Sequence, residues 1–236
     1  MALRDEIKEQ QKTLKGKSFK YKWEYFLEYY KWATIAVIIA AIAIFSFIKG
    51  VVTAKHDAFY AICVNAITMP SSDAFSEYIE IDTKKEKVVF DTTYSMIDEG
   101  GNQNSYLSLQ KMVANIAAGT ADVIIGDLDV LQTLAPNEFF ADLRNYFSED
   151  ELNALGDKVI YSQLKDDDGN LIGEEIPLII NVTDSPLLNS YPFFVYDEGF
   201  GIIANTSRPE RCKKFYNFLY DEAILEKAKE PMQPYG

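Results

Sequence analysis

Residues 30–48 read YKWATIAVIIAAIAIFSFI, and this stretch divides the chain into two parts. Lys31, near its edge, is the one charged residue in it. An α-helix rises about 1.5 Å per residue, so a helix of this length crosses a hydrocarbon core of roughly 30 Å. Two polar residues inside the run, Thr34 and Ser46, can bond to the helix's own carbonyl groups. The stretch therefore predicts a transmembrane helix rather than the buried core helix of a soluble protein.

The charges on the two sides of this helix differ in sign. Residues 1–32 hold eight basic and five acidic side chains, whereas residues 49–236 hold fifteen basic and thirty-one acidic ones, a net charge of −16. Because cytoplasmic flanks of membrane helices are rich in Lys and Arg, we expect residues 1–29 to form a cytoplasmic arm. The prediction is a single-pass type II protein of the cell membrane, whose C-terminal domain is extracytoplasmic.

The arm and the anchor each leave an alternative open. Residues 52–54 (Val-Thr-Ala) are similar to a signal-peptide cleavage site, but the arm and the apolar run exceed the usual signal-peptide lengths, which favours an uncleaved signal anchor over residues 30–48. Phe19, Trp23, Phe26 and Tyr30 recur at helical spacing in the arm. This spacing predicts a juxtamembrane amphipathic helix at the headgroup level, or alternatively a docking site for another membrane protein.

A linker over residues 49–57 leads to a domain over residues 58–236. This length suffices for one compact domain with its own core. Its negative net charge excludes a nucleic-acid partner, because phosphate binding requires clustered Lys and Arg side chains.

Short apolar runs alternate with helical patterns through this domain. We predict strands at residues 59–64, 87–90, 121–125, 195–196 and 201–204, and a hairpin of residues 159–164 with 175–182 around the turn sequence 166–170. We predict helices at residues 72–78, at 109–117 before Gly119, from the capping box Ser148–Glu151 to Gly156, for one turn after Ser185, and from Ser207 onwards. This order predicts an α/β fold with a mostly parallel or mixed sheet and helices on both faces.

The order of these segments resembles that of bacterial extracellular solute-binding proteins, the type II periplasmic-binding-protein-like family. The helix before Gly119, the strand ADVIIGD (residues 121–127) and the segment FADLRNY (residues 140–146) follow one another as in that family. Glu175-Ile-Pro177 is similar to the family's hinge strand, and GIIANT (residues 201–206) to its return strand. Family members insert a second lobe between these two strands, where this chain has only residues 181–198. The resemblance therefore implies a single lobe, mounted on a membrane anchor.

Ligands of such sheets bind beyond the carboxyl ends of the strands. The candidate ligand-binding residues are accordingly those that follow the first strand, the third strand and the hinge strand: Asn65, Thr68, Asp127, Asp129, Thr183 and Asp184. Asp127 and Asp184 are also each placed to cap a following helix, which is the alternative role for both.

Tyr191-Pro-Phe-Phe194 stands where the second lobe of the family would begin. The aromatic residues Tyr191, Phe193 and Phe194 either seal the edge of the sheet or offer a surface to a partner.

Catalytic and cofactor motifs are missing from the sequence. His56 is the only histidine, which removes Ser-His-Asp and Cys-His catalysis and histidine-based zinc sites. No phosphate-binding loop or dinucleotide motif occurs, and the acidic turn at residues 166–170 lacks the first ligand of a calcium loop because Leu164 stands there. We therefore expect no enzyme activity, no cofactor and no metal site.

Cys63 and Cys212 are the two cysteines of the chain. In an exported domain they can form a disulfide, although Cys63 also has the pattern of an ordinary core residue.

These observations predict a membrane protein that displays a solute-binding-protein-like domain outside a bacterial cell. The domain would bind a small molecule or a protein partner. One alternative is a structural or assembly subunit of a membrane complex, and another is a ligand-sensing component that signals through a partner. An aromatic-lined concavity favours ligand binding, whereas a flat exposed apolar patch favours assembly.

Overall fold

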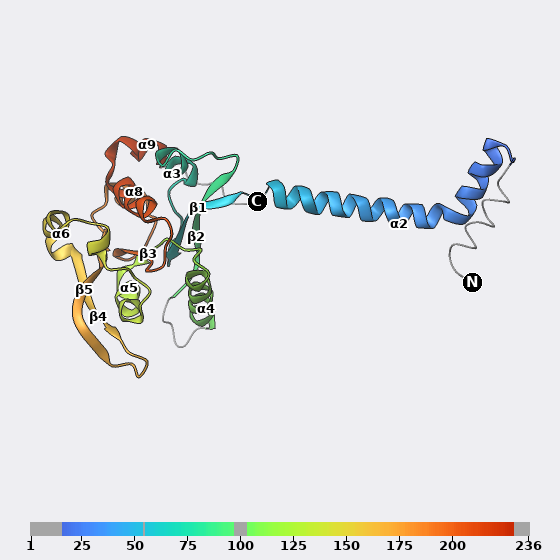
Figure 1. Ribbon diagram of the computed structural model, residues 1–236. Helices are drawn as coiled ribbons and strands as arrows, with labels where there is room; N and C mark the ends of the chain where they lie inside the picture. Colours follow the sequence, from blue (N-terminus) through green and yellow to red (C-terminus); the bar gives the residue numbers. More distant parts are fainter. Residues whose placement is uncertain (1–15, 54, 97–102, 229–236) are drawn as a thin grey trace. The chain divides into compact units, whose positions relative to one another are not determined.

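The computed structural model describes residues 16–53, 55–96 and 103–228, and the chain divides into two compact units, residues 1–54 and 55–236 (Figure 1). The first fifteen residues of the predicted arm lie outside the described residues. So does residue 54 of the predicted linker.

The described part of the N-terminal unit contains one long helix, α2 (Phe19–Thr53). Residues Lys31–Gly50 within it have a mean hydropathy of 2.2, and none of this stretch is buried. By length and composition this helix can span a membrane, and a signal sequence has the same properties. Residues 49–53 of the predicted linker continue α2, and residues 56–57 begin the first strand.

The C-terminal unit is an α/β domain built on one open sheet, as predicted. Its strands are β1 (His56–Val64), β2 (Glu86–Tyr94), β3 (Val123–Asp127), β4 (Val159–Lys165), β5 (Leu171–Asn181) and β6 (Glu198–Ile202). Their spatial order is β2-β1-β3-β6-β5-β4. The sheet is mixed, because β1 is parallel to β2 and to β3, whereas β6 is antiparallel to β3 and β5, and β5 to β4.

Helices cover both faces of this sheet. Against one face pack α3 (Ser72–Tyr78), α6 (Glu149–Leu155), α7 (Pro186–Asn189) and α8 (Pro209–Tyr220), and against the other α4 (Gln103–Ala117) and α5 (Leu128–Leu134). Shorter turns are η1 (Ala135–Asn137), η2 (Leu143–Asn145), η3 (Gly156–Lys158), η4 (Glu222–Ile224) and α9 (Leu225–Ala228). Alternate residues of β1 enter the two cores, Phe59 on one face and Tyr60 on the other. Burial on both faces explains why β1 is continuously apolar.

Several local predictions are confirmed at the level of single hydrogen bonds. Ser148 and Glu151 form the expected capping box of α6, and Gly156 ends that helix. Ser185 caps α7, with Pro186 in its first position. The β4–β5 hairpin closes over Asp166, whose backbone N–H donates to the carbonyl of Asn170 (3.0 Å).

The strand predicted at residues 195–196 is wrong. Val195 and Tyr196 are exposed and lie outside any strand, and β6 begins at Glu198. Glu198 pairs with Asp127, the last residue of β3, and the Asp197 carbonyl accepts from the backbone N–H of Leu128 (2.8 Å), where α5 already begins, so β6 cannot extend its pairing with β3 further. The last long helix likewise begins at Pro209 rather than Ser207, because proline favours the first helical position.

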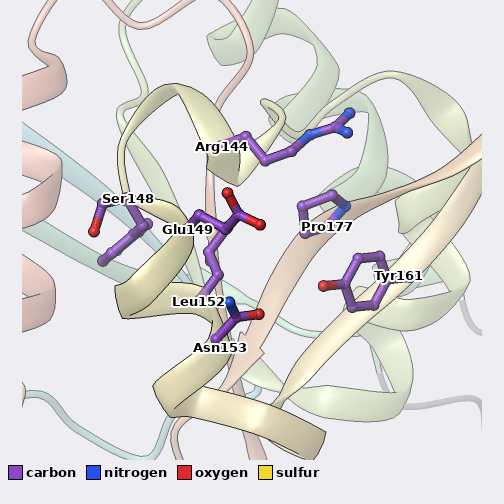
Figure 2. A pocket seen from close by; sticks show the side chains of 8 residues that line it. Arg144, Ser148, Glu149, Leu152, Asn153, Tyr161 and Pro177 are labelled. Atoms are coloured by element: carbon purple, nitrogen blue, oxygen red, sulfur yellow. The ribbon is translucent and has the colours of Figure 1, made fainter.

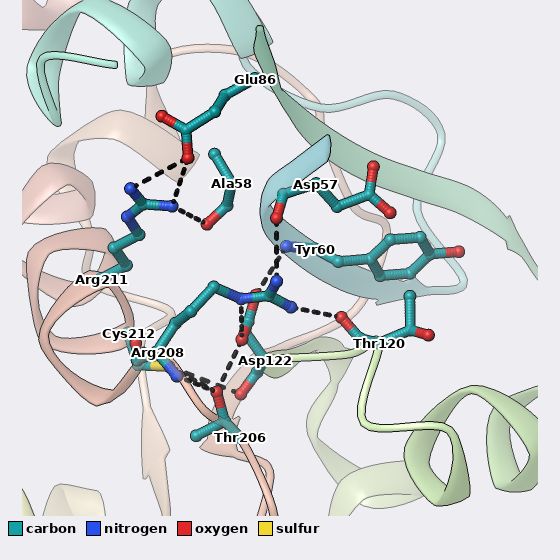
Figure 3. A network of polar contacts seen from close by, with 10 residues as sticks. All are labelled: Asp57, Ala58, Tyr60, Glu86, Thr120, Asp122, Thr206, Arg208, Arg211 and Cys212. Atoms are coloured by element: carbon teal, nitrogen blue, oxygen red, sulfur yellow. Dashed lines mark hydrogen bonds and ion pairs between the residues drawn. The ribbon is translucent and has the colours of Figure 1, made fainter. Parts of the chain in front are cut away.

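A buried charge pair joins the centre of the sheet to α8 (Figure 3). Asp122, just before β3, is fully buried, and the Arg208 Nε donates to both of its carboxylate oxygens (2.8 and 2.9 Å). The Tyr60 backbone N–H and the Thr206 hydroxyl also donate to this carboxylate (2.8 and 2.6 Å). The other nitrogens of Arg208 donate to the carbonyls of Asp57 (2.8 Å) and Thr120 (2.7 Å). The Asp122 carboxylate therefore accepts four hydrogen bonds from three donor groups, which come from β1 and from the segment before α8.

Replacing Arg208 with Met should destabilise the domain strongly, because it leaves the Asp122 carboxylate buried without its cation. We expect a loss of about 3–5 kcal/mol in the free energy of unfolding. The matched control is Arg144→Met, which breaks the pair between Asp142 and the exposed Arg144 side chain and should cost less than about 1 kcal/mol. Denaturant unfolding followed by near-ultraviolet circular dichroism measures both, and equal losses would contradict the assigned role of the pair.

Candidate functional site

The predicted ligand residues follow strands that end at one edge of the sheet. β1 and β3 are parallel neighbours, and the chain then leaves them toward opposite faces, to α3 and to α5. This is a topological switch point, where open α/β sheets bind their ligands. Gly126 allows the two strands to meet closely there, since a Cβ atom would lie 2.1 Å from the Val64 carbonyl oxygen.

At this point Asn65 and Asp127 are in direct contact. The Asn65 side-chain amide donates to the Asp127 Oδ2 (3.2 Å), and its Oδ1 accepts from the Met96 backbone N–H (2.7 Å). The Asp127 Oδ1 accepts from the backbone N–H groups of Asp129 (3.1 Å) and Val130 (3.4 Å), so it caps α5 as predicted. Both side chains therefore hold the backbone turns that follow β1 and β3. Asp129 itself is exposed in the first turn of α5.

Thr68 and the aromatic segment after α7 are tied together. The carbonyl of Phe193 accepts from the backbone N–H groups of Ile67 (2.8 Å) and Thr68 (3.5 Å). Phe193 and Phe194 are buried in the core on the α8 face, so of the three aromatic candidates only Tyr191 is exposed to a partner. Phe193 and Phe194 therefore contribute their side chains to the core of the domain.

Thr183 and Asp184 have different roles. The Thr183 hydroxyl accepts from the backbone N–H of Glu198 (3.0 Å), which fixes the start of β6. The prediction that Asp184 caps a helix is wrong, because Pro186 occupies the first helical position and makes Ser185 the cap. Asp184 instead pairs with Lys158 and accepts from the Tyr220 hydroxyl (2.9 Å). Burial opposes ionisation of Asp184, but these two donors outweigh it and lower its pKa.

Glu198 also lies at this edge of the sheet, and it is not among the site residues predicted from the sequence. It pairs in register with Asp127 across the same edge and is half-buried. Burial, with a smaller contribution from the adjacent Asp197, raises the pKa of Glu198 to about 7. An acidic pair directly before the apolar run of β6 is the sequence signal that indicates such a residue.

The stability of the domain should depend on pH through Glu198. In the folded domain the Glu198 carboxyl keeps its proton up to about pH 7, whereas its ordinary pKa is 4.5. At pH values between these two pKa values the unfolded chain binds fewer protons than the folded domain does. The free energy of unfolding therefore falls as pH rises through this range. Glu198→Gln removes this loss. We expect the variant to be more stable than the wild type at pH 8 by about 1 kcal/mol, a value reduced for partial exposure, or roughly 2–4 °C in Tm.

Thermal unfolding at pH 4 and pH 8 measures this difference. At pH 4 both proteins carry a neutral side chain at position 198, and their Tm values should agree. A gain of the same size at both pH values would show that Glu198 acts through packing rather than through its proton.

Asp127→Ala should cost about 1 kcal/mol, the usual value of a lost helix cap. Asp129→Ala is the matched control, since Asp129 lies in the same turn, is exposed and caps nothing through its side chain. It should cost less than about 0.5 kcal/mol. Loss of ligand binding by Asp127→Ala at an unchanged Tm would instead assign Asp127 to ligand recognition.

A second candidate site is a hollow of about 470 Å³ between α6 and the β4–β5 hairpin (Figure 2). Tyr161 of β4 and Pro177 of β5 are register partners and line one side. The other walls come from η2, α6 and the residues between them: Arg144, Phe147, Ser148, Glu149, Leu152 and Asn153.

The polar side chains of this hollow differ in whether they have a hydrogen-bond partner within the domain. Arg144 is held by the Asp142 carboxylate, to which its Nε donates (2.9 Å). Within the described part of the chain, the Glu149 carboxylate, the Asn153 amide and the Tyr161 hydroxyl have no hydrogen-bond partner. The hollow therefore offers a carboxylate, an amide and a phenol to a bound group, on a floor of apolar side chains.

The two cysteines are free and buried, so the structure contains no bond between them. The Cys212 thiol lies near the carbonyl oxygens of Arg208 (3.4 Å) and Asp122 (3.6 Å). Burial raises the pKa of Cys63 well above its ordinary value and the pKa of Cys212 to about 12. Both thiols are therefore unreactive at neutral pH.

Comparison with protein-family models, curated protein sequences and solved structures gave no match for this chain. Among the residues that the structure describes, His, Cys, Asp and Glu form no group of three or more that could hold a metal ion.

Proposed function

We propose that this chain is a single-pass membrane protein that displays one binding domain outside the cell and acts by binding rather than catalysis. The observation that carries the proposal is α2, in which Lys31–Gly50 is apolar and entirely unburied. Exposure of this much apolar surface to water is unfavourable, and a hydrocarbon core removes that cost. The excess of basic residues before this helix, and of acidic residues after it, supports a cytoplasmic arm and an exported domain.

The binding domain corresponds to a single lobe of a solute-binding-like protein. The mixed α/β sheet and the switch point between β1 and β3 support this reading. Residues 182–197, which connect β5 to β6, contain the single turn α7, and this short connection favours one lobe. Two-lobed binding proteins enclose small molecules between their lobes. At the switch point, the Asn65 and Asp127 side chains bond to each other and to the backbone. A protein partner therefore fits this domain better than an enclosed small molecule.

A second function, assembly of a membrane complex, is favoured by the surface of α4. Tyr106, Leu107 and Val113 are exposed on this helix, and an apolar groove of about 420 Å³ runs between α4 and α5. Exposed apolar patches of this kind are typical of protein–protein contacts.

Thiol labelling in intact cells tests the membrane topology. Cys63 and Cys212 are buried and give a low background. Asp167→Cys places a thiol on the exposed hairpin turn, and Lys20→Cys places one in the exposed part of the arm. In a bacterium with a single membrane, a membrane-impermeant maleimide should label Cys at position 167 directly, and Cys at position 20 only after the cells are permeabilised. The reverse pattern, or release of the labelled domain into the medium, would contradict the proposal.

A further inference from the structure

The β4–β5 hairpin forms the open end of the sheet. In the described part of the chain, β4 has β5 as its one neighbouring strand. Figure 1 shows this hairpin extending beyond the helices that cover the sheet. Leu171 and Ile172, in the outer part of β5, are 56% and 49% exposed. An edge strand presents backbone N–H and C=O groups to which an extended chain can bond.

The hollow beside α6 lies next to this edge (Figure 2). Alternate side chains of a strand point to opposite faces of a sheet. A strand added along β4 would therefore send every second side chain toward the face that carries Tyr161, and so toward the hollow. Peptide-binding domains that use strand addition combine these two features, because main-chain bonds supply affinity and a side-chain pocket supplies specificity.

The charge of this region is complementary to a basic partner. Residues 148–176 contain nine acidic and two basic side chains, a net charge of −7. Three consecutive carboxylates, Asp166 to Asp168, stand at the hairpin turn, and Glu149 lines the hollow without an ion-pair partner among the described residues. A Lys or Arg side chain in the hollow would contact the Glu149 carboxylate, and its aliphatic part would lie on Pro177 and Leu152.

The backbone of β4 limits the length of the partner segment. β4 spans seven residues, and both of its register shifts against β5 place the extra residues on β5. The free edge of β4 is therefore short and carries no bulge of its own. The edge therefore suits a short extended segment.

We propose that a short, extended, basic segment of a protein partner adds to β4 as a further strand and places a Lys or Arg side chain in the hollow against Glu149. This inference rests on the binding function proposed above, and it names the class of partner and the site that receives it.

Peptide titration of the full-length protein in neutral maltoside micelles tests this inference. The probe is a fluorescein-labelled decapeptide of alternating Lys and Val, measured by fluorescence anisotropy against protein and against micelles alone. A decapeptide of alternating Lys and Pro carries the same charge but has half the backbone donors and resists strand pairing. We expect it to bind at least tenfold more weakly. Equal affinity for the two peptides would show attraction by charge alone and would overturn strand addition.

Glu149→Gln tests the hollow. It should weaken binding of the Lys-Val peptide about threefold to fivefold, as expected for one exposed ion pair. Asp73→Asn is the matched control, because Asp73 is an exposed carboxylate in the first turn of another seven-residue helix, α3. This control should bind as the wild type does. Equal affinities of Glu149→Gln and Asp73→Asn would exclude the hollow as the side-chain site.

Failure of this inference is distinguishable from failure of the proposed function. If neither peptide binds but Cys at position 167 is labelled in intact cells, the domain is exported and has a different partner. If the peptide binds but labelling shows a cytoplasmic domain, the binding edge is real and the proposed location is wrong.

Discussion

The structure of the C-terminal domain depends on one buried ionic contact, that between Asp122 and Arg208. A carboxylate removed from water costs several kcal/mol unless a cation and hydrogen bonds replace its solvation. Here Arg208, Thr206 and the Tyr60 backbone supply them together. Arg208 also donates to the carbonyl of Asp57, at the start of β1, and to the carbonyl of Thr120, before β3. The start of β1, the start of β3 and the N-terminal end of α8 are thus fixed to one point, which specifies the centre of the sheet.

The edges of the sheet are less constrained than this centre. At the carboxyl ends of β1 and β3, Asn65 and Asp127 use their side chains to hold turns, so the switch point is structurally complete without a ligand. At the far edge, β4 lacks an outer neighbour in the described chain, and the hollow beside it contains the uncommitted polar groups Glu149, Asn153 and Tyr161. These polar side chains without a hydrogen-bond partner among the described residues therefore lie at the periphery of the sheet, away from the Asp122–Arg208 contact.

The sequence predicted those features that depend on local pattern. The apolar runs of β1 and β3, the capping box at Ser148 and the proline-initiated turn at Ser185 each reflect interactions within a few residues. Long-range pairing was not predictable in this way. Asp122 and Arg208 are 86 residues apart, so nothing in either local pattern identifies the other. The strand predicted at Val195 failed for the same reason, since its existence depends on where β3 ends.

Residue-resolved hydrogen exchange of the full-length protein tests most directly whether the centre of the sheet, around Asp122 and Arg208, is more stable than its edge at β4. The backbone N–H groups of Tyr60 and Ile203 both bond to Asp122. They should exchange only through global unfolding. The outward-facing amides of β4 should exchange orders of magnitude faster, through local opening or directly. Comparable protection at the two places, or faster exchange at Tyr60 and Ile203 than in β4, would contradict the account.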